Sequence, residues 1–401
     1  MTWQNSRLGN HFKIKHGYAF KSKYFDTSGK YIVVTPGNFY EKGGFKYRDN
    51  EKYYSADPPD NFILKKGDLI IAMTEQAEGL LGSSAIVNQD NIYLHNQRLG
   101  LVINLNQKTL NKYFLYCLFN TALIRNKIRA TATGLKVRHT APDRILNIEV
   151  SLPDITTQQR IAEILSNYDR LIDNNNRRIA LLEESIHLLY KEWFVRLRFP
   201  GYESVKIVDG IPEGWNRKTL KDIALSIRQS IHPSNTDPNT PYVGLEHIPR
   251  QSIALTSWGY SNQVDSNKFV FTKSDILFGK IRPYFHKVVF APVNGICSSD
   301  AIVIRPINQD LFGLTLSLVS SVAFVNYTSK TSKEGSKMPR ANWDVMEQYP
   351  ILIPSSKLLR EFNTLVNLVT NQITNLIFTN QRLRQARDLL LPHLINGSIA
   401  V

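Results

Sequence analysis

The clearest pattern of apolar and polar positions lies after Pro153. Ten residues follow one another in alternating steps of four and three, which is the 3.5-residue period of a coiled-coil seam: Ile161, Leu165, Tyr168, Ile172, Asn175, Ile179, Leu182, Ile186, Leu189 and Trp193. Thr156 and Gln159 have the spacing of a capping box, so we expect Thr156 to be the N-cap. The helix is expected to end before Pro200, because proline blocks helix continuation.

A second seam with the same period closes the chain, and Gly397 after it suits a helix C-cap. Its positions are Phe362, Val366, Val369, Ile373, Leu376, Asn380, Leu383, Arg387, Leu390 and Leu394. Each helix would be roughly 55 Å long at ~1.5 Å per residue.

Each seam has one asparagine near its middle. Antiparallel pairing places Asn175 opposite Asn380, whereas parallel pairing buries both amides against apolar side chains at about 1–3 kcal/mol per unpaired group. We therefore predict an antiparallel coiled coil in which these two side chains set the register and lie within hydrogen-bond distance. The alternative is two unrelated amphipathic helices, each packed on its own domain.

The segments outside the long helices have mixed character. Short apolar runs bounded by Gly, Pro and Asn predict strands, at 31–34, 69–72, 101–103, 288–290 and 301–304. The pattern predicts one helix over 111–129 and its counterpart over 311–327.

The order of these features repeats along the chain. At an offset of 201 residues, Gly134 falls on Gly335 and Asp143 on Asp344, and one helical seam then falls on the other. The sequence therefore predicts an α+β protein with pseudo-two-fold symmetry. Its two similar mixed domains, 1–153 and 200–354, would be separated by two long helices, 154–199 and 355–401.

The charge of the chain is uneven. The net charge is +15 over 401 residues, but residues 1–155 hold +8, residues 196–354 hold +5, residues 355–401 hold +3, and residues 156–195 hold −1. A basic field attracts a nucleic-acid backbone, although solubility alone would also explain it. Two cysteines exclude a disulfide framework. No apolar leader or ~20-residue membrane span is visible, so we expect a cytoplasmic protein without a membrane partner.

Signatures of catalysis are missing from the sequence. Asp57-Pro58-Pro59-Asp60 has an aspartate where an amino-methyltransferase motif needs an aromatic, so we interpret it as a surface turn. Neither a phosphate-binding loop nor a metal-binding arrangement of histidines is present in the sequence. We expect no catalytic residue, metal or cofactor in this chain.

Several stretches resemble one family along nearly the whole chain. Residues 152–165 (LPDITTQQRIAEIL) and 169–172, then 278–284 (FGKIRPY), 295–300 (GICSSD) and 390–394 (LLPHL), resemble type I restriction–modification specificity subunits. Asp154 departs from the family pattern, which usually has a second proline there, and should alter only how the helix begins.

The resemblance implies a non-catalytic subunit that recognises DNA. Two target-recognition domains would each read half of a bipartite site on double-stranded DNA. The helices would hold them apart and dock two methyltransferase subunits, and restriction endonuclease subunits would be further partners. The near-neutral first helix agrees, because a helix lying along phosphates should be basic. Half-sites lie about one helical turn apart, ~34 Å, which a ~55 Å helix pair can span.

Candidates for DNA contact are basic, aromatic and amide residues in loops, since these types position a protein on phosphates or reach base edges. A solvated surface charge is the alternative for each one, and the sequence does not divide them between phosphate and base contacts. The candidates are Lys13, Lys15, Tyr18, Lys21, Lys46, Arg48, Gln97, Arg98, Lys136, Arg138, His139, Lys280, Arg282, Tyr284, Lys287, Lys337, Arg340 and Asn342.

Three other functions remain open at this point. The chain could be a self-contained DNA methyltransferase or nuclease. It could be the specificity subunit of a related system, or a coiled-coil scaffold whose basic charge is incidental.

Overall fold

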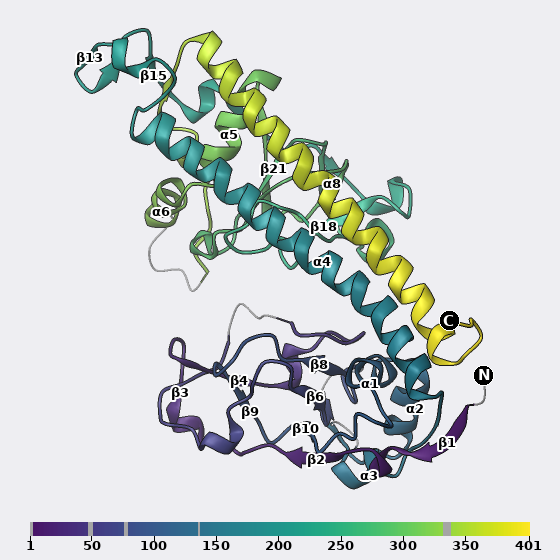
Figure 1. Cartoon of the computed structure of the whole chain (residues 1–401). Coiled ribbons are helices and arrows are strands. Elements are labelled where there is room, and N and C mark those ends of the chain that lie inside the picture. The colour runs from purple at the N-terminus through teal and green to yellow at the C-terminus, as the bar shows by residue number, and fades with distance from the viewer. Residues whose placement is uncertain (1–2, 47–50, 76–78, 135–136, 332–337) are drawn as a thin grey trace. The chain divides into compact units, whose positions relative to one another are not determined.

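The computed structural model describes residues 3–46, 51–75, 79–134, 137–331 and 338–401 (Figure 1). The chain forms two compact units. Unit 1 consists of Met1–Leu171 and Leu383–Val401, and unit 2 consists of Ile172–Arg382.

Unit 1 is built on two four-stranded sheets. The first has the antiparallel order β2-β10-β6-β8, and the second has the order β3-β5-β4-β9, in which β4 and β9 are parallel. Two further pairs, β1 with β12 and β7 with β11, complete the strands described in this unit. Their bounds are β1 Gln4–Arg7, β2 Lys13–His16, β3 Phe25–Asp26, β4 Tyr31–Val34, β5 Tyr53–Tyr54, β6 Leu69–Ala72, β7 Thr74–Glu75, β8 Ser84–Ile86, β9 Tyr93–His95, β10 Leu99–Ile103, β11 Arg138–His139 and β12 Glu149–Leu152. Its shorter α-helices are α1 Lys112–Phe119, α2 Ala122–Ala130 and α3 Pro142–Leu146.

Unit 2 has the same plan. Its four-stranded sheet has the order β16-β24-β21-β22, its second sheet has the order β17-β20-β23-β18-β19, and β15 pairs with β25 as β1 pairs with β12. The β13–β14 hairpin is an addition to this plan. The strands are β13 Ile207–Val208, β14 Ile211–Pro212, β15 Asn216–Thr219, β16 Ala224–Ile227, β17 Ser230–Ile231, β18 Pro241–Val243, β19 Gly259–Tyr260, β20 Lys268–Phe271, β21 Ile276–Gly279, β22 Val288–Phe290, β23 Gly295–Cys297, β24 Ala301–Pro306 and β25 Pro350–Ile353. The shorter helices are α5 Phe312–Val319, α6 Val322–Lys330 and α7 Trp343–Met346. The predicted internal repeat is therefore confirmed.

The two helices predicted in the mixed domains are each broken in two. Thr121 has an extended backbone and its hydroxyl accepts a hydrogen bond from the Ile124 amide, so it caps α2 and separates it from α1. Ser321 does the same for α6 by accepting from the Phe324 amide. The prediction of single helices was wrong, because an N-cap inside an apolar run starts a new helix.

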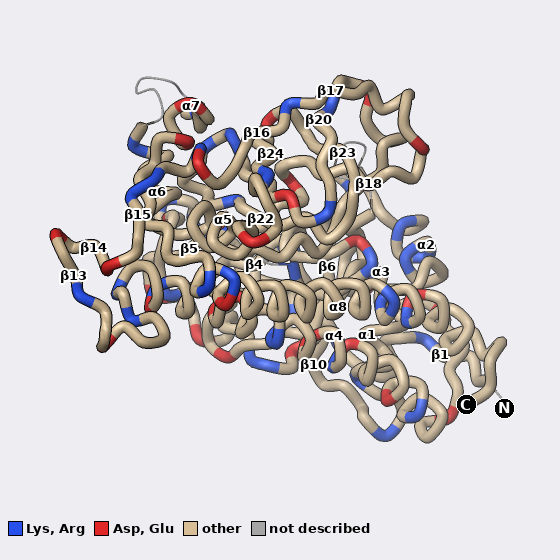
Figure 2. Tube along the Cα trace, turned by 90° about the horizontal axis from the view of Figure 1, so that it is seen from above, with Lys and Arg blue, Asp and Glu red and all other residues tan. Residues whose placement is uncertain are grey.

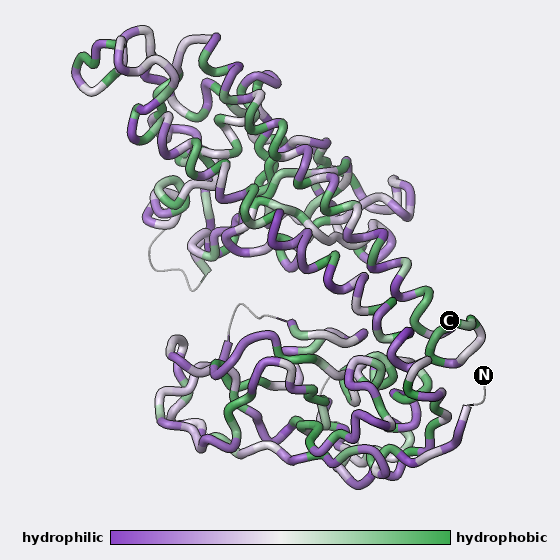
Figure 3. The backbone as a smooth tube through the Cα atoms, in the orientation of Figure 1, coloured by the Kyte–Doolittle hydropathy of each residue, from purple (hydrophilic) through white to green (hydrophobic). Residues whose placement is uncertain are grey.

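The long helices are α4, Ile155–Tyr190, which continues as a π-turn over Lys191–Val195, and α8, Ser356–Ile395. Hydrophobic positions recur along both helices among hydrophilic ones (Figure 3). In unit 1, Ile161 near the start of α4 shares a buried cluster with Leu394 at the end of α8. In unit 2, Ile186 near the end of α4 shares a cluster with Phe362 near the start of α8. The helices are therefore antiparallel, as the seams predict.

The beginning of α4 differs from the prediction. The Asp154 carboxylate accepts hydrogen bonds from the Thr157 amide and hydroxyl, both at 2.9 Å, so Asp154 is the cap. These bonds from Thr157 lower the pKa of Asp154. A capping box on Thr156 was the wrong expectation, because Asp154 offers a charged acceptor one turn before Thr157.

The asparagine pair lies within unit 2 and is buried. The Asn175 amide donates to Asn380 Oδ1 at 2.9 Å, and the Asn380 amide donates to Asn176 Oδ1 at 2.9 Å. Asn175 is 7% and Asn380 2% exposed. The predicted contact is confirmed, and the pairing satisfies polar groups that the apolar seam would otherwise leave unsatisfied.

Replacing Asn175 with leucine is expected to lower the free energy of unfolding by about 1–3 kcal/mol, because the buried Asn380 oxygen then loses its donor. Leucine at both positions should recover most of that stability, since no unpaired amide remains in the seam. Urea unfolding of wild type, both single variants and the double variant gives the coupling energy. A single variant as stable as wild type would contradict the pairing.

In the described ranges, no single helix is long and apolar enough to cross a membrane. One bent helix pair, Gln309–Val319 with Val322–Lys330, passes that test by length and composition only.

Candidate nucleic-acid interface

The turn between β9 and β10 presents two predicted residues of unit 1. The Asn96 side chain accepts a hydrogen bond from the Arg98 amide at 3.0 Å, and the Asn96 carbonyl accepts from Leu99 at 2.9 Å. The Gln97 amide donates to the Tyr18 carbonyl at 2.9 Å, which ties the turn to the segment that follows β2. Because these bonds use backbone groups, the exposed side chains of Gln97 and Arg98 remain available to a ligand.

Two further predicted residues lie beside this turn. The Met73 amide donates to the Arg98 carbonyl and the Met73 carbonyl accepts from Thr140, both at 2.9 Å. The β7–β11 pair then places Arg138 opposite Glu75 and His139 opposite Thr74, whose hydroxyl lies 3.1 Å from His139 Nδ1. We call Gln97, Arg98, Arg138 and His139 the first polar cluster.

A buried, uncharged histidine holds the turn of the first polar cluster in place by hydrogen bonds. His95 is fully buried, and burial lowers its pKa to about 4. Its Nε2 lies 3.0 Å from the Leu99 carbonyl, and its own carbonyl accepts from the Tyr18 amide at 2.9 Å. The turn is therefore held by neutral hydrogen bonds at physiological pH.

A second group of predicted residues meets in unit 2. The Lys280 amide donates to the Asp300 carbonyl at 2.7 Å, and the Lys280 carbonyl accepts from Ala341 at 2.8 Å. The segment of Arg340 and Asn342 therefore lies against Lys280, and these side chains line a hollow of about 700 Å³. Arg228, Ser299 and Asp300 also line this hollow. We call Lys280, Asp300, Arg340 and Asn342 the second polar cluster.

The two clusters are built on the same backbone scaffold. Asp300 donates its amide to Ser298 Oγ at 3.2 Å, as Arg98 does to Asn96 Oδ1, and Ala301 donates to the Ser298 carbonyl, as Leu99 does to that of Asn96. The carbonyl of the third turn residue then accepts from the residue directly after β6 in unit 1, Met73, and from the residue directly after β21 in unit 2, Lys280. Ser298–Asp300 is thus the counterpart of Asn96–Arg98. Ser299 and Asp300 are not among the contacts that the sequence predicts, because their residue types differ from those of Gln97 and Arg98.

Other candidates of unit 1 lie apart from the turn or already have partners. Lys13, Lys21 and Lys46 are exposed. The Lys15 ammonium donates to the Asn61 carbonyl and lies 4.4 Å from the centre of a phenylalanine ring. Tyr18 is half-buried and packs against Phe20 and Phe62.

The remaining candidates of unit 2 are likewise either exposed or already bound to other groups of the protein. Tyr284 is 55% exposed, whereas Lys287 donates to the Leu245 carbonyl at 2.6 Å. Arg282 has a left-handed backbone with φ of 51°, and its buried Nε has no hydrogen-bond partner among the described residues. Asn342 also caps α7 by accepting from the Asp344 amide. Arg48, Lys136 and Lys337 lie outside the described residues.

Helix α2 of unit 1 also carries basic residues. Lys and Arg lie along α2 in unit 1, which contains Arg125, Lys127 and Arg129 (Figure 2). Arg125 is partly buried and donates to the Leu81 carbonyl at 2.7 Å, so it holds its loop rather than facing solvent. Burial lowers the pKa of Arg125 to about 10, so it remains charged at neutral pH.

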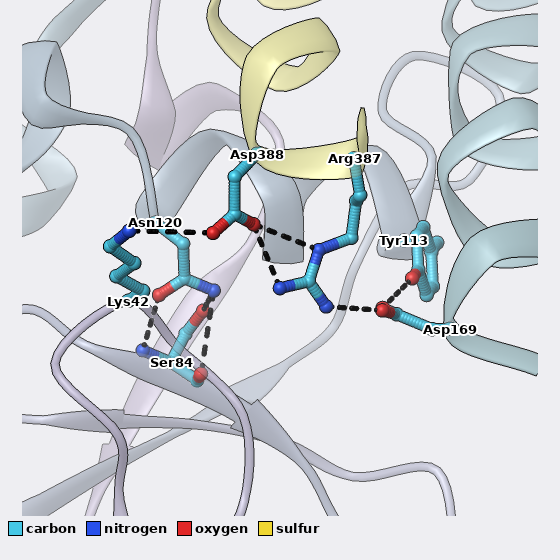
Figure 4. Close-up of polar contacts among 7 residues, drawn as sticks. All are labelled: Lys42, Ser84, Tyr113, Asn120, Asp169, Arg387 and Asp388. Carbon is cyan, nitrogen blue, oxygen red and sulfur yellow. Dashed lines mark hydrogen bonds and ion pairs between the residues drawn. The ribbon is translucent and has the colours of Figure 1, made fainter. Parts of the chain in front are cut away.

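A polar network in unit 1 joins the long helices to the mixed domain (Figure 4). The Tyr113 hydroxyl of α1 and the Arg387 guanidinium of α8 both donate to the carboxylate of Asp169 on α4. Arg387 also binds Asp388, which forms an ion pair with Lys42 at 3.4 Å. Burial, and then the charge of Asp169, raises the pKa of Tyr113 above its usual range, so its hydroxyl stays a donor. The network fixes the helix ends on the domain that holds the first polar cluster.

The described part of the chain contains no group of three or more His, Cys, Asp or Glu residues that could hold a metal ion.

Comparison with known proteins identifies the family. The model of the type I restriction modification DNA specificity domain matches residues 1–184 and 212–373. The chain is 24% identical over 310 residues to the type I restriction enzyme MjaIX specificity subunit of Methanocaldococcus jannaschii, covering 72% of this chain and 69% of that protein. It is 24% identical over 298 residues to the EcoDI specificity subunit of Escherichia coli, covering 65% of each.

The fold has a solved counterpart. The type I restriction–modification system S subunit from M. genitalium superposes with a TM-score of 0.56 at 14% identity, covering 98% of this chain and 96% of that one. Since the family model matches both halves of the sequence and most of the 401 residues, the chain belongs to the family of type I restriction–modification DNA specificity domains.

Proposed function

We propose that this chain is the non-catalytic, sequence-specific DNA-recognition subunit of a type I restriction–modification complex, and that it reads a bipartite site. The observation that carries the proposal is the paired turn, Asn96–Arg98 in unit 1 and Ser298–Asp300 in unit 2. The same backbone hydrogen bonds present different side chains at equivalent positions. A duplicated backbone turn with different side chains in its two copies suits two half-sites of different sequence, because base identity is read by side chains.

The division of labour follows the repeat. Residues 1–153 and 200–354 are proposed as the two target-recognition domains, and residues 154–199 and 355–401 as the helices that space them. In both polar clusters the positive charge exceeds the negative, which suits a surface that meets phosphates.

The long helices are the proposed docking site for methyltransferase subunits. Leu181 and Leu188 on α4 are 66% and 52% exposed and lie seven residues apart, so they share a face that does not belong to the seam. On α8, Leu365 and Leu368 are 41% and 57% exposed. Exposed leucines repeated on helix faces suit a partner helix. The internal repeat supports two methyltransferase subunits, and the names of the relatives support assembly with restriction subunits.

Deleting the gene from its host is expected to remove one bipartite methylation motif from the genome, because a methyltransferase without its recognition subunit does not find its site. Genome-wide mapping of methylated bases, with and without the gene, measures this directly. Complementation with the intact gene is the control and should restore the same motif.

A self-contained enzyme would behave differently. Purified chain with DNA and Mg²⁺ or S-adenosylmethionine should neither cleave nor methylate. Turnover by the chain alone, or an unchanged set of methylated sites after deletion, would overturn the proposal. Loss of DNA binding only on changing helix-surface residues would favour a scaffold instead.

A further inference from the structure

We propose that Asp300 determines specificity at one base pair, by accepting a hydrogen bond from the exocyclic amino group of a cytosine in the half-site read by unit 2. The inference rests on the proposed function and assigns to Asp300 and Arg98 the same role, reading one base each, in the two different half-sites.

The backbone places Asp300 where Arg98 stands in the first repeat. Both residues hold the third position of a turn that joins the two sheets of their unit, β9 to β10 in unit 1 and β23 to β24 in unit 2. Both donate their amide to the side chain two residues before them. Both carbonyls accept from the residue directly after a strand, the Arg98 carbonyl from Met73 after β6 at 2.9 Å and the Asp300 carbonyl from Lys280 after β21 at 2.7 Å. The two side chains therefore leave equivalent points of equivalent scaffolds.

The surroundings of Asp300 explain how a carboxylate can face DNA. Its Oδ1 lies 3.7 Å from Arg340 Nη1, and its side chain is 36% exposed. Lys280 and Arg228 line the same hollow. These cations offset the repulsion between a carboxylate and phosphates, while the accessible oxygens can still meet a base edge.

The chemistry of the two positions is opposite. A guanidinium only donates, which suits the O6 and N7 acceptors of guanine, whereas an ionised carboxylate only accepts, which suits the N4 amino group of cytosine. The same backbone turn would therefore select different base pairs in the two half-sites, because it carries arginine at position 98 in unit 1 and aspartate at position 300 in unit 2.

The experiment maps the methylation motif of the full complex with Asp300→Asn. Asparagine has the same size, but its amide both donates and accepts, which suits adenine rather than cytosine. The preference for C at one position of one half-site is expected to fall roughly 5- to 150-fold, as loss of ~1–3 kcal/mol of discrimination implies. All other positions should remain as in wild type.

Two variants test whether Asp300 acts directly and in the right half. Arg98→Ala should relax one position in the other half-site. Arg340→Ala should lower methylation at all sites without changing the motif, if Arg340 meets phosphates and Asp300 meets the base. Asp310→Asn, at an exposed residue outside the hollow, is the charge-matched control and should leave the motif unchanged.

An unchanged motif in Asp300→Asn, a change in the same half-site as Arg98→Ala, or the same change in Arg340→Ala would overturn the inference while leaving the proposed function intact. Uniform loss of methylation with the wild-type motif would also overturn it. Failure of the proposed function is distinguishable, because the wild-type complex would then show no bipartite motif.

Discussion

Replacing Gly17 with alanine is expected to remove recognition of the half-site that we propose unit 1 reads, with discrimination at that half falling on the order of 100-fold as the proposed base contacts of Gln97 and Arg98 are lost. Gly17 follows β2 and its amide donates to the Leu99 carbonyl at 3.2 Å, which brings it directly against the β9–β10 turn. A Cβ at this position would lie 1.9 Å from the Asn96 carbonyl oxygen and 2.3 Å from its carbon. Both are backbone atoms, so no rotamer change relieves the clash.

The turn must therefore move for alanine to fit. Its hydrogen bonds to Tyr18 and Met73 would be strained or broken, and overpacking of this kind costs ~1–3 kcal/mol or more in stability. The half-site read by unit 2 should keep its preferences, since Ser298–Asp300 is a separate copy of the turn. Methylation mapping reports both halves in one experiment.

Gly67→Ala is the matched control for this prediction. Gly67 has φ of 88°, so alanine is strained there, yet its Cβ would meet nothing within 4 Å. The control should lose about 1–2 kcal/mol of stability from the backbone strain alone and keep the full motif. If Gly67→Ala and Gly17→Ala change the motif alike, general destabilisation explains both and the clash does not.

The sequence predicts the long helices well because their signal is periodic. The seam is a repeated pattern in which one polar residue stands out, so the pairing of Asn175 with Asn380 follows from counting positions. Single caps are harder to predict, because several residues compete for the same orphan amides. At the start of α4 both Asp154 and Thr156 are residue types that cap helices, and the sequence alone does not show that Asp154 is the one that accepts from the Thr157 amide. Similarly, Thr121 starts a new helix inside an apolar run.

The candidate site could be predicted only in part for a related reason. Gln97 and Arg98 are recognisable from their side chains, but their counterparts Ser299 and Asp300 are not similar to them. The equivalence lies in backbone hydrogen bonds, such as Asp300 to Ser298, which leave no pattern of residue types. Likewise, the ammonium of Lys287 binds a carbonyl that lies 42 positions away in the chain, and composition carries no information on that contact.

Replacing Glu183 with alanine is expected to lower the free energy of unfolding of unit 2 by about 2–4 kcal/mol, since buried donors lose their acceptor. Glu183 lies on α4 and is 9% exposed. Its Oε1 accepts from the Ser252 hydroxyl at 2.6 Å and from the amides of Ile253 and Ala254 at 2.8 Å. The Ala254 amide has a second acceptor in Ser252 Oγ at 3.3 Å, so the loss centres on Ile253. Urea unfolding checks the size of the effect.

Glu183→Gln is the matched variant, because it keeps an oxygen in place of Oε1 without the charge. It should be much closer to wild type than the alanine variant, and a glutamine variant as unstable as alanine would show that the charge, not the acceptor, holds the helix to this domain. The two variants together separate a lost hydrogen bond from a lost carboxylate.

The difference in unfolding free energy between wild type and Glu183→Gln should depend on pH, and this dependence is a second test of the burial of Glu183. Burial raises the pKa of Glu183 above its ordinary value of 4.5, although its three hydrogen bonds oppose the shift. The folded state therefore holds a proton at pH values where the unfolded chain has released it, and the contribution of Glu183 to stability declines as pH rises from 4.5 through the folded pKa. Glutamine does not titrate, so the free energy of unfolding of Glu183→Gln relative to wild type should increase over that pH window and then stay constant. A difference that is flat from pH 4 to 8 would mean that the carboxylate is solvated rather than buried against Ile253.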